Sequence, residues 1–186
     1  MKAALGVLAL VLNIVGYVPY IRDILKGIVR PQRITWGIWT ILTSVTAVNQ
    51  IANGGGFSSL FFVSTTLLVT TTFVLSIKHG VGGATRLDRA CLLLAVVLFG
   101  YWALARDTYA STFVAVIIDI VAFTPTLIKT YKMPQTETYP QWALAGIGGV
   151  LTLMAVPKLE LVLIIYPLYI AIANLLIVTT KFVREK

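Results

Sequence analysis

The chain has 186 residues, of which 58% are hydrophobic and only 12% are charged. Soluble domains average about 25% charged residues, so this composition excludes both a soluble globular fold and intrinsic disorder, and it predicts a polytopic membrane protein. The formal net charge of +8 therefore bears first on membrane topology, because cytoplasmic loops collect Lys and Arg.

Seven apolar segments are each long enough to form a transmembrane helix, which needs about 20 residues. In chain order they cover residues 3–21, 34–53, 57–77, 89–105, 110–128, 141–157 and 160–180. No small-residue cleavage site follows the first segment, so we expect a retained span and not a signal peptide. The sequence thus predicts an all-α protein with seven transmembrane helices.

The basic residues are distributed unevenly over the loops of this arrangement. Twelve of the fifteen lie in the first, third and fifth loops and the C-terminal tail: Arg22, Lys26, Arg30, Arg33, Lys78, Arg86, Arg89, Lys129, Lys132, Lys181, Arg184 and Lys186. The positive-inside rule then predicts an outer N-terminus and a cytoplasmic C-terminus. For a prokaryotic protein the membrane would be the plasma (inner) membrane. Positions at span ends explain the basic charge without nucleic-acid binding.

Two stretches of the chain are similar at an offset of 106 residues. Residues 13–19 read Asn-Ile-Val-Gly-Tyr-Val-Pro and residues 119–125 read Asp-Ile-Val-Ala-Phe-Thr-Pro, and the same offset relates Trp36 to Trp142. Duplicated units are common in transporters. The similarity predicts two three-helix repeats, since both stretches begin such a group of spans.

The repeats give the chain three parts. Residues 1–80 form the first three-helix repeat, 81–107 the connector helix and 108–186 the second repeat. Three helices and one connector make an even number of crossings. Both repeats therefore enter the membrane in the same direction, related by a pseudo-two-fold axis along the membrane normal.

This arrangement of three, one and three helices, with Pro19 and Pro125 near the cytoplasmic ends of the first helix of each repeat, resembles the PQ-loop and SWEET (MtN3-like) transporter superfamily. The Pro-Gln dipeptide of PQ-loop proteins reads Pro19-Tyr20 and Pro125-Thr126 here. The resemblance implies a transporter of small solutes. It also implies that Asn174, in the last helix of the second repeat, grips substrate, with Thr71 at the corresponding position of the first repeat.

Asp119 is the one carboxylate predicted in the middle of a span. A charge at the bilayer centre is costly, so we expect Asp119 to face a cavity, a partner or a proton. Its repeat mate is Asn13, which we expect near Asp119 or on the opposite wall of a common cavity. The functional interpretation makes Asp119 a proton-coupling site and Asn13 a solute ligand; the alternative is hydrogen bonding between helices.

Polar and aromatic residues on other spans complete the candidate pathway. Trp36, Trp39, Thr43 and Gln50 follow one face of the second span, and Trp142 is the repeat mate of Trp36. These Trp residues are candidates for an aromatic wall or gate, or for an interfacial belt. The last span carries Tyr166, Tyr169 and Asn174.

Pro19 and Pro125 each remove a helical hydrogen bond. They are candidate hinges for rocking of the two repeats, or they simply end their helices. Tyr17 and Phe123, one turn from the polar pair, are candidate gate residues.

The predicted function is secondary-active or facilitative transport of an amino acid or a sugar by alternating access, with protons as possible co-substrate. A nucleoside-like solute, a receptor of the same architecture, and a membrane scaffold remain as alternatives. His79 is the single histidine and no phosphate-binding glycine motif is present, so we expect no metal site, no cofactor and no enzyme activity. The lipid bilayer and a small solute are the expected partners, and the oligomeric state stays open.

Overall fold

A computed structural model describes residues 2–52, 57–104, 108–155 and 160–186. Within these ranges the regular structure consists of seven α-helices and one short 3-10 helix, without strands: α1 (Lys2–Leu25), α2 (Arg33–Ala52), α3 (Phe57–His79), α4 (Arg86–Leu104), α5 (Thr108–Lys132), η1 (Pro134–Thr136), α6 (Tyr139–Ala155) and α7 (Leu161–Glu185). The prediction of an all-α protein is confirmed. Each apolar segment became one helix because backbone groups in an apolar setting must bond internally.

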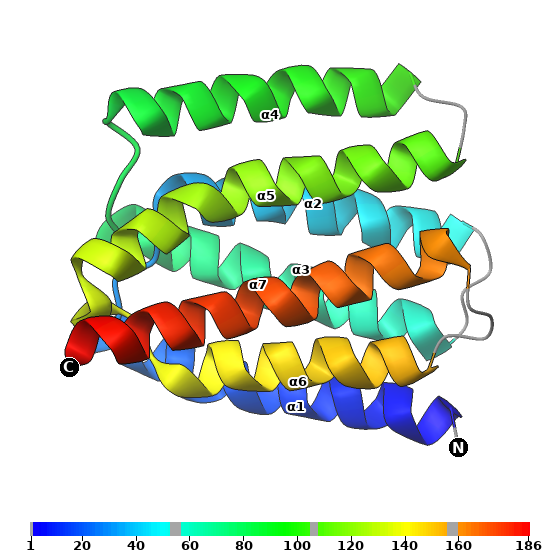
Figure 1. Ribbon diagram of the computed structural model, residues 1–186, viewed down its shortest axis with the longest axis horizontal. Coiled ribbons are helices and arrows are strands. Elements are labelled where there is room, and N and C mark those ends of the chain that lie inside the picture. Colours follow the sequence, from blue (N-terminus) through cyan, green and yellow to red (C-terminus); the bar gives the residue numbers. More distant parts are fainter. Residues whose placement is uncertain (1, 53–56, 105–107, 156–159) are drawn as a thin grey trace.

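The seven helices run along one common axis, and the chain alternates between the two ends of the bundle (Figure 1). The start of α1 and the end of α7 lie at opposite ends (Figure 1). The loops before α2, α4 and α6 lie at the end where α7 finishes. The twelve basic residues named above therefore gather at this end, which we call the basic end.

Four described helical segments are long and apolar enough to cross a membrane: Ala4–Leu25, Arg86–Leu104, Thr112–Lys132 and Ile164–Glu185. Large apolar side chains on their outer faces are exposed, such as Leu93, Val96 and Val97 of α4. This surface fits an integral membrane protein, because a bilayer favours apolar side chains that water does not.

Six of the helices form a closed ring, in the order α1, α6, α7, α5, α2, α3 and back to α1. Helix α4 packs outside this ring against α5 and α2, and it lies at the edge of the bundle (Figure 1). The first half of the chain contributes α1, α2 and α3, and the second half α5, α6 and α7. In each half the third helix lies between the other two, and α1 packs on α6 as α5 packs on α2. The contacts thus follow a two-fold pattern that relates α1, α2 and α3 to α5, α6 and α7.

A hydrogen-bonded loop fixes α4 to this ring at the basic end. The Asp88 carboxylate accepts hydrogen bonds from Gln32 Nε2 at 2.6 Å and from the backbone N–H groups of Gly83 and Thr85. The Gln32 Oε1 atom in turn accepts from the backbone of Ile34 at 2.7 Å, at the start of α2. The bond from Ile34 caps α2, and α4 is capped by Thr85, whose Oγ1 atom accepts from the Asp88 backbone N–H at 3.0 Å, because helix N-termini offer unpaired N–H groups.

Gly149 sets the close approach of α6 to α7. A Cβ atom there would lie 2.8 Å from the Ala171 backbone nitrogen and 3.1 Å from the Pro167 carbonyl oxygen. Both are backbone atoms of α7, so the helix itself would have to shift. The absence of a side chain at Gly149 therefore serves the close packing of α6 on α7.

Gly149→Ala is expected to lower the free energy of unfolding by about 1–3 kcal/mol, the usual cost of overpacking. The matched control is Gly148→Ala on the same helix, where a Cβ atom meets only the Ala9 carbonyl oxygen at 3.9 Å. The control is expected to be neutral or stabilising by up to about 1 kcal/mol, because Ala favours a helix. Thermal unfolding in detergent measures both. Equal effects of the two substitutions would contradict the packing role of Gly149.

Candidate functional site

Asp119 lies in the middle of α5 with only 3% of its surface exposed. Its carboxylate accepts three hydrogen bonds: from Trp39 Nε1 at 2.7 Å, from the Tyr166 hydroxyl at 2.7 Å and from the Tyr169 hydroxyl at 3.2 Å. Trp39 belongs to α2 and the two tyrosines to α7, the helices on either side of α5 in the ring. The site is therefore held together by both halves of the chain.

All three of these donors are neutral, so they solvate the carboxylate without neutralising its charge. None of the ion pairs among the described residues involves Asp119. A buried carboxylate inside an apolar bundle needs a proton or a cationic partner to become neutral. The arrangement is thus chemically suited to take up a proton or the positively charged group of a solute.

Asn13 has an equivalent place in the other half of the ring. Its Nδ2 atom donates to Thr65 Oγ1 at 3.1 Å, which links α1 to α3. Asp119 is linked to α7 in the same way, by Tyr166 and Tyr169. No hydrogen bond in the described part of the chain joins Asn13 to Asp119, so the two repeat mates bind separate partners.

An aromatic cluster fills the ring between Asp119 and the basic end. It consists of Tyr17, Tyr20, Trp36, Trp39 and Trp142. The ring centroids of Trp36 and Trp142 lie 6.4 Å apart, and those of Trp39 and Trp142 6.2 Å apart. Trp36 is 1% exposed and Trp142 3%. Such buried rings do not form an interfacial belt, which would contact lipid headgroups; they close the centre of the bundle.

A buried ion pair lies beneath this cluster at the basic end. Lys129 of α5 pairs with Glu137, which follows η1, and their side chains are 4% and 0% exposed. Trp142 Nε1 donates to Glu137 Oε2 at 2.8 Å, and Lys129 Nζ donates to the Arg30 carbonyl oxygen at 2.9 Å. The pair therefore joins the first and the fifth loop at this end to the aromatic cluster, and we call it the basic-end latch.

The sequence did not single out this latch. Both residues lie at the margin of a polar loop, where charged side chains are usually solvated. The one available signal was that Glu137 is a rare acid within a basic loop. Tyr20 was equally missed as a partner, although its hydroxyl lies 3.5 Å from Glu137 Oε1.

The remaining predicted ligands mostly bond to their own helices. Thr43 donates to the Trp39 carbonyl oxygen, Thr71 to that of Leu67 and Asn174 to that of Ile170. Thr71 is exposed on the outside of the bundle, whereas Asn174 is buried. No hydrogen bond among the described residues joins any of these three to Asp119. The side chain of Gln50 lies outside the part of the chain that the structure describes.

The paired prolines lie inside their helices and do not end them. α1 continues past Pro19 to Leu25, and α5 continues past Pro125 to Lys132; Figure 1 shows α5 bending in this part. The role of both prolines as hinges stays a prediction. Tyr17 and Phe123, the predicted gate residues, are both buried in the same core as the aromatic cluster.

The described residues contain no group of three or more His, Cys, Asp and Glu side chains that could hold a metal ion. The groups that the candidate site offers are one carboxylate, three neutral hydrogen-bond donors and the neighbouring aromatic cluster.

Comparison of the chain with protein-family models, with curated proteins and with solved structures finds no match.

Proposed function

We propose that the protein is a secondary transporter or facilitator for a small polar organic solute, an amino acid or a sugar, which works by alternating access. In this proposal all seven helices cross the membrane, the basic end faces the cytoplasm and the solute binds near Asp119. The two-fold contact pattern of the ring supports two parallel three-helix repeats. It also supports our proposal that the chain belongs to the PQ-loop and SWEET superfamily.

The observation that carries this proposal is the set of bonds around Asp119. The carboxylate belongs to the second half of the chain, Trp39 to the first and Tyr166 to the second. A rocking movement of one half against the other would therefore change the number of donors on the carboxylate. Binding of a solute or a proton at Asp119 would in turn favour one arrangement of the halves, as coupled transport requires.

The closed basic end supports the same mechanism. The aromatic cluster and the basic-end latch separate Asp119 from the end that we propose to be cytoplasmic. In an alternating-access cycle this arrangement corresponds to an inward-closed state. Opening toward the cytoplasm would need separation of Trp36 from Trp142 and release of the latch.

A thermal-shift screen of the purified protein tests the proposal. Amino acids, sugars and nucleosides are added at two pH values, and the compounds that raise Tm are then tested for uptake into proteoliposomes. A ligand at about 100 times its Kd stabilises the folded state by about 2.7 kcal/mol, which a melting curve detects. We expect one class to raise Tm and to be taken up.

Protein-free liposomes are the control for leakage in the uptake assay. Binding without uptake would contradict transport and favour a receptor. An unchanged Tm with every compound, and no uptake, would favour a scaffold in which the polar residues only join helices.

A further inference from the structure

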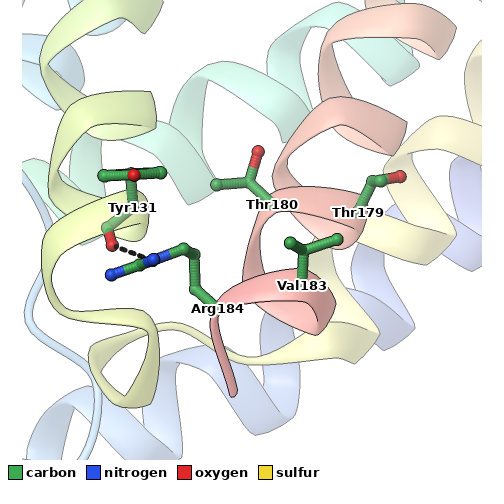
Figure 2. Close-up of a pocket in the computed structure, with 5 residues that line it drawn as sticks. All are labelled: Tyr131, Thr179, Thr180, Val183 and Arg184. Atoms are coloured by element: carbon green, nitrogen blue, oxygen red, sulfur yellow. Dashed lines mark hydrogen bonds between the residues drawn. The ribbon is translucent and has the colours of Figure 1, made fainter. Parts of the chain in front are cut away.

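A groove lies on the outside of the bundle at the basic end, between the C-terminal parts of α5 and α7. It has a volume of about 200 Å³ and is lined by Tyr131, Thr179, Thr180, Val183 and Arg184 (Figure 2). Apart from Thr180, which is half-buried, these residues are exposed. The groove is therefore open to whatever surrounds the protein, and it is separate from the Asp119 site.

Arg184 is held in place across this groove. Its guanidinium carbon lies 4.3 Å from the centre of the Tyr131 ring, and its Nε atom donates to the Tyr131 carbonyl oxygen at 3.1 Å (Figure 2). These contacts reduce the conformational freedom that an exposed arginine otherwise loses on binding a ligand. The two terminal nitrogens of the guanidinium take no part in this hydrogen bond, and together they can donate to a ligand.

No carboxylate neutralises Arg184 in the described part of the chain. The ion pairs there join Arg22 to Asp23, Lys129 to Glu137 and Lys181 to Glu185. The neighbouring Glu185 is thus already paired with Lys181, and it also accepts a hydrogen bond from Tyr139 at 2.6 Å. The groove therefore carries a net positive charge.

The position of the groove relates it to the membrane surface. The apolar segments Thr112–Lys132 and Ile164–Glu185 both end beside it, so a bilayer around them would place its headgroups at this level. The Tyr131 ring and the exposed Lys132 beside it in the chain are typical of such an interface. Basic pockets between helices at this depth bind anionic headgroups.

We propose that the groove is a binding site for an anionic phospholipid, with the phosphate on the terminal nitrogens of Arg184. Paired N–H donors of a guanidinium match the oxygens of a phosphate. The Val183 side chain and the threonine methyl groups face the apolar part of the lipid below the headgroup. The same chemistry suits free inorganic phosphate, so the test must separate the two sources.

Native mass spectrometry of the purified protein tests this site with two lipids, phosphatidylglycerol and the zwitterionic phosphatidylcholine. We expect the wild type to retain phosphatidylglycerol in preference, and Arg184→Gln to bind it about tenfold more weakly. The matched control is Arg22→Gln, which removes the same charge from the same end of the bundle. Arg184→Lys keeps the charge but loses the fork, and we expect it to restore binding only in part.

Millimolar inorganic phosphate is added as a competitor in a second arm, and it is expected to leave the bound lipid in place. Displacement of the lipid by phosphate would overturn the lipid assignment. Equal losses of lipid in Arg184→Gln and Arg22→Gln would also overturn it, since any basic residue would then serve. Because transport plays no part in these measurements, they do not depend on the function proposed above.

Discussion

Asp119→Asn is expected to abolish pH-dependent uptake of the solute while the protein stays folded. Asn has nearly the shape of Asp, and its oxygen still accepts a hydrogen bond from Trp39, so the helix contacts around α5 are kept. The amide cannot bind a proton or carry a negative charge. A hydrogen bond to a charged group contributes about 1.5–3 kcal/mol, so a solute that binds the carboxylate directly loses about 10- to 100-fold in affinity.

Uptake into proteoliposomes at several pH values measures the effect, with circular dichroism and Tm as checks of folding. Asp23→Asn is the matched control, because Asp23 is a carboxylate of the basic end that pairs with the exposed Arg22. Wild-type uptake is expected to change with pH, and the control is expected to follow it. Transport by Asp119→Asn at the wild-type rate, whatever the pH, would remove Asp119 from the mechanism.

Glu137→Gln is expected to destabilise the protein by about 3–5 kcal/mol, the cost of breaking a buried ion pair from one side. The substitution removes the one negative charge that pairs with the buried ammonium group of Lys129, which then has only neutral acceptors, the Arg30 carbonyl oxygen and an amide oxygen at position 137. The double variant Lys129→Met with Glu137→Gln removes both charges. It is expected to recover most of the loss, because no unpaired charge remains in the core.

The free energies of unfolding of the two single variants, Glu137→Gln and Lys129→Met, and of the double variant give a double-mutant cycle for the latch. Glu185→Gln is the control, since Glu185 also pairs with a buried lysine, Lys181, but its own side chain is 35% exposed. Partly exposed pairs contribute about 0–1 kcal/mol. If Glu137→Gln costs no more than Glu185→Gln, the latch does not stabilise the closed basic end.

The helices could be predicted from the sequence because length and hydropathy alone define an apolar helix. The predicted ends were less accurate at the basic end: the first helix ends at Leu25 and not at residue 21, and the fifth at Lys132 and not at residue 128. The last turn of each carries charged side chains, which can remain helical beyond the apolar stretch. Hydropathy marks the apolar stretch and not the end of the hydrogen bonds.

The partners within the site could be predicted only in part. Asp119, Trp39 and Tyr169 were each candidates because polar groups in a span need a partner. That they bind one another depends on α5 lying between α2 and α7, which hydropathy does not encode. Thr71 was predicted to contact the solute but is exposed on the outside of the bundle. Threonine and apolar residues occur on all sides of α3, so the sequence does not show which face of this helix points inward.

Helix α4 joins the two halves of the chain but lies outside the ring, so the two halves pack on each other through other helices. The contacts between α1 and α6 and between α5 and α2 are those that two separate three-helix chains would make as a symmetric dimer. The peripheral connector adds one passage along the bundle, so that α1 and α5 run in the same direction (Figure 1), and it raises the effective concentration of the two halves. In the duplicated arrangement that we propose, the joined halves can carry different residues at equivalent positions, Asn13 in one and Asp119 in the other, which two identical subunits cannot.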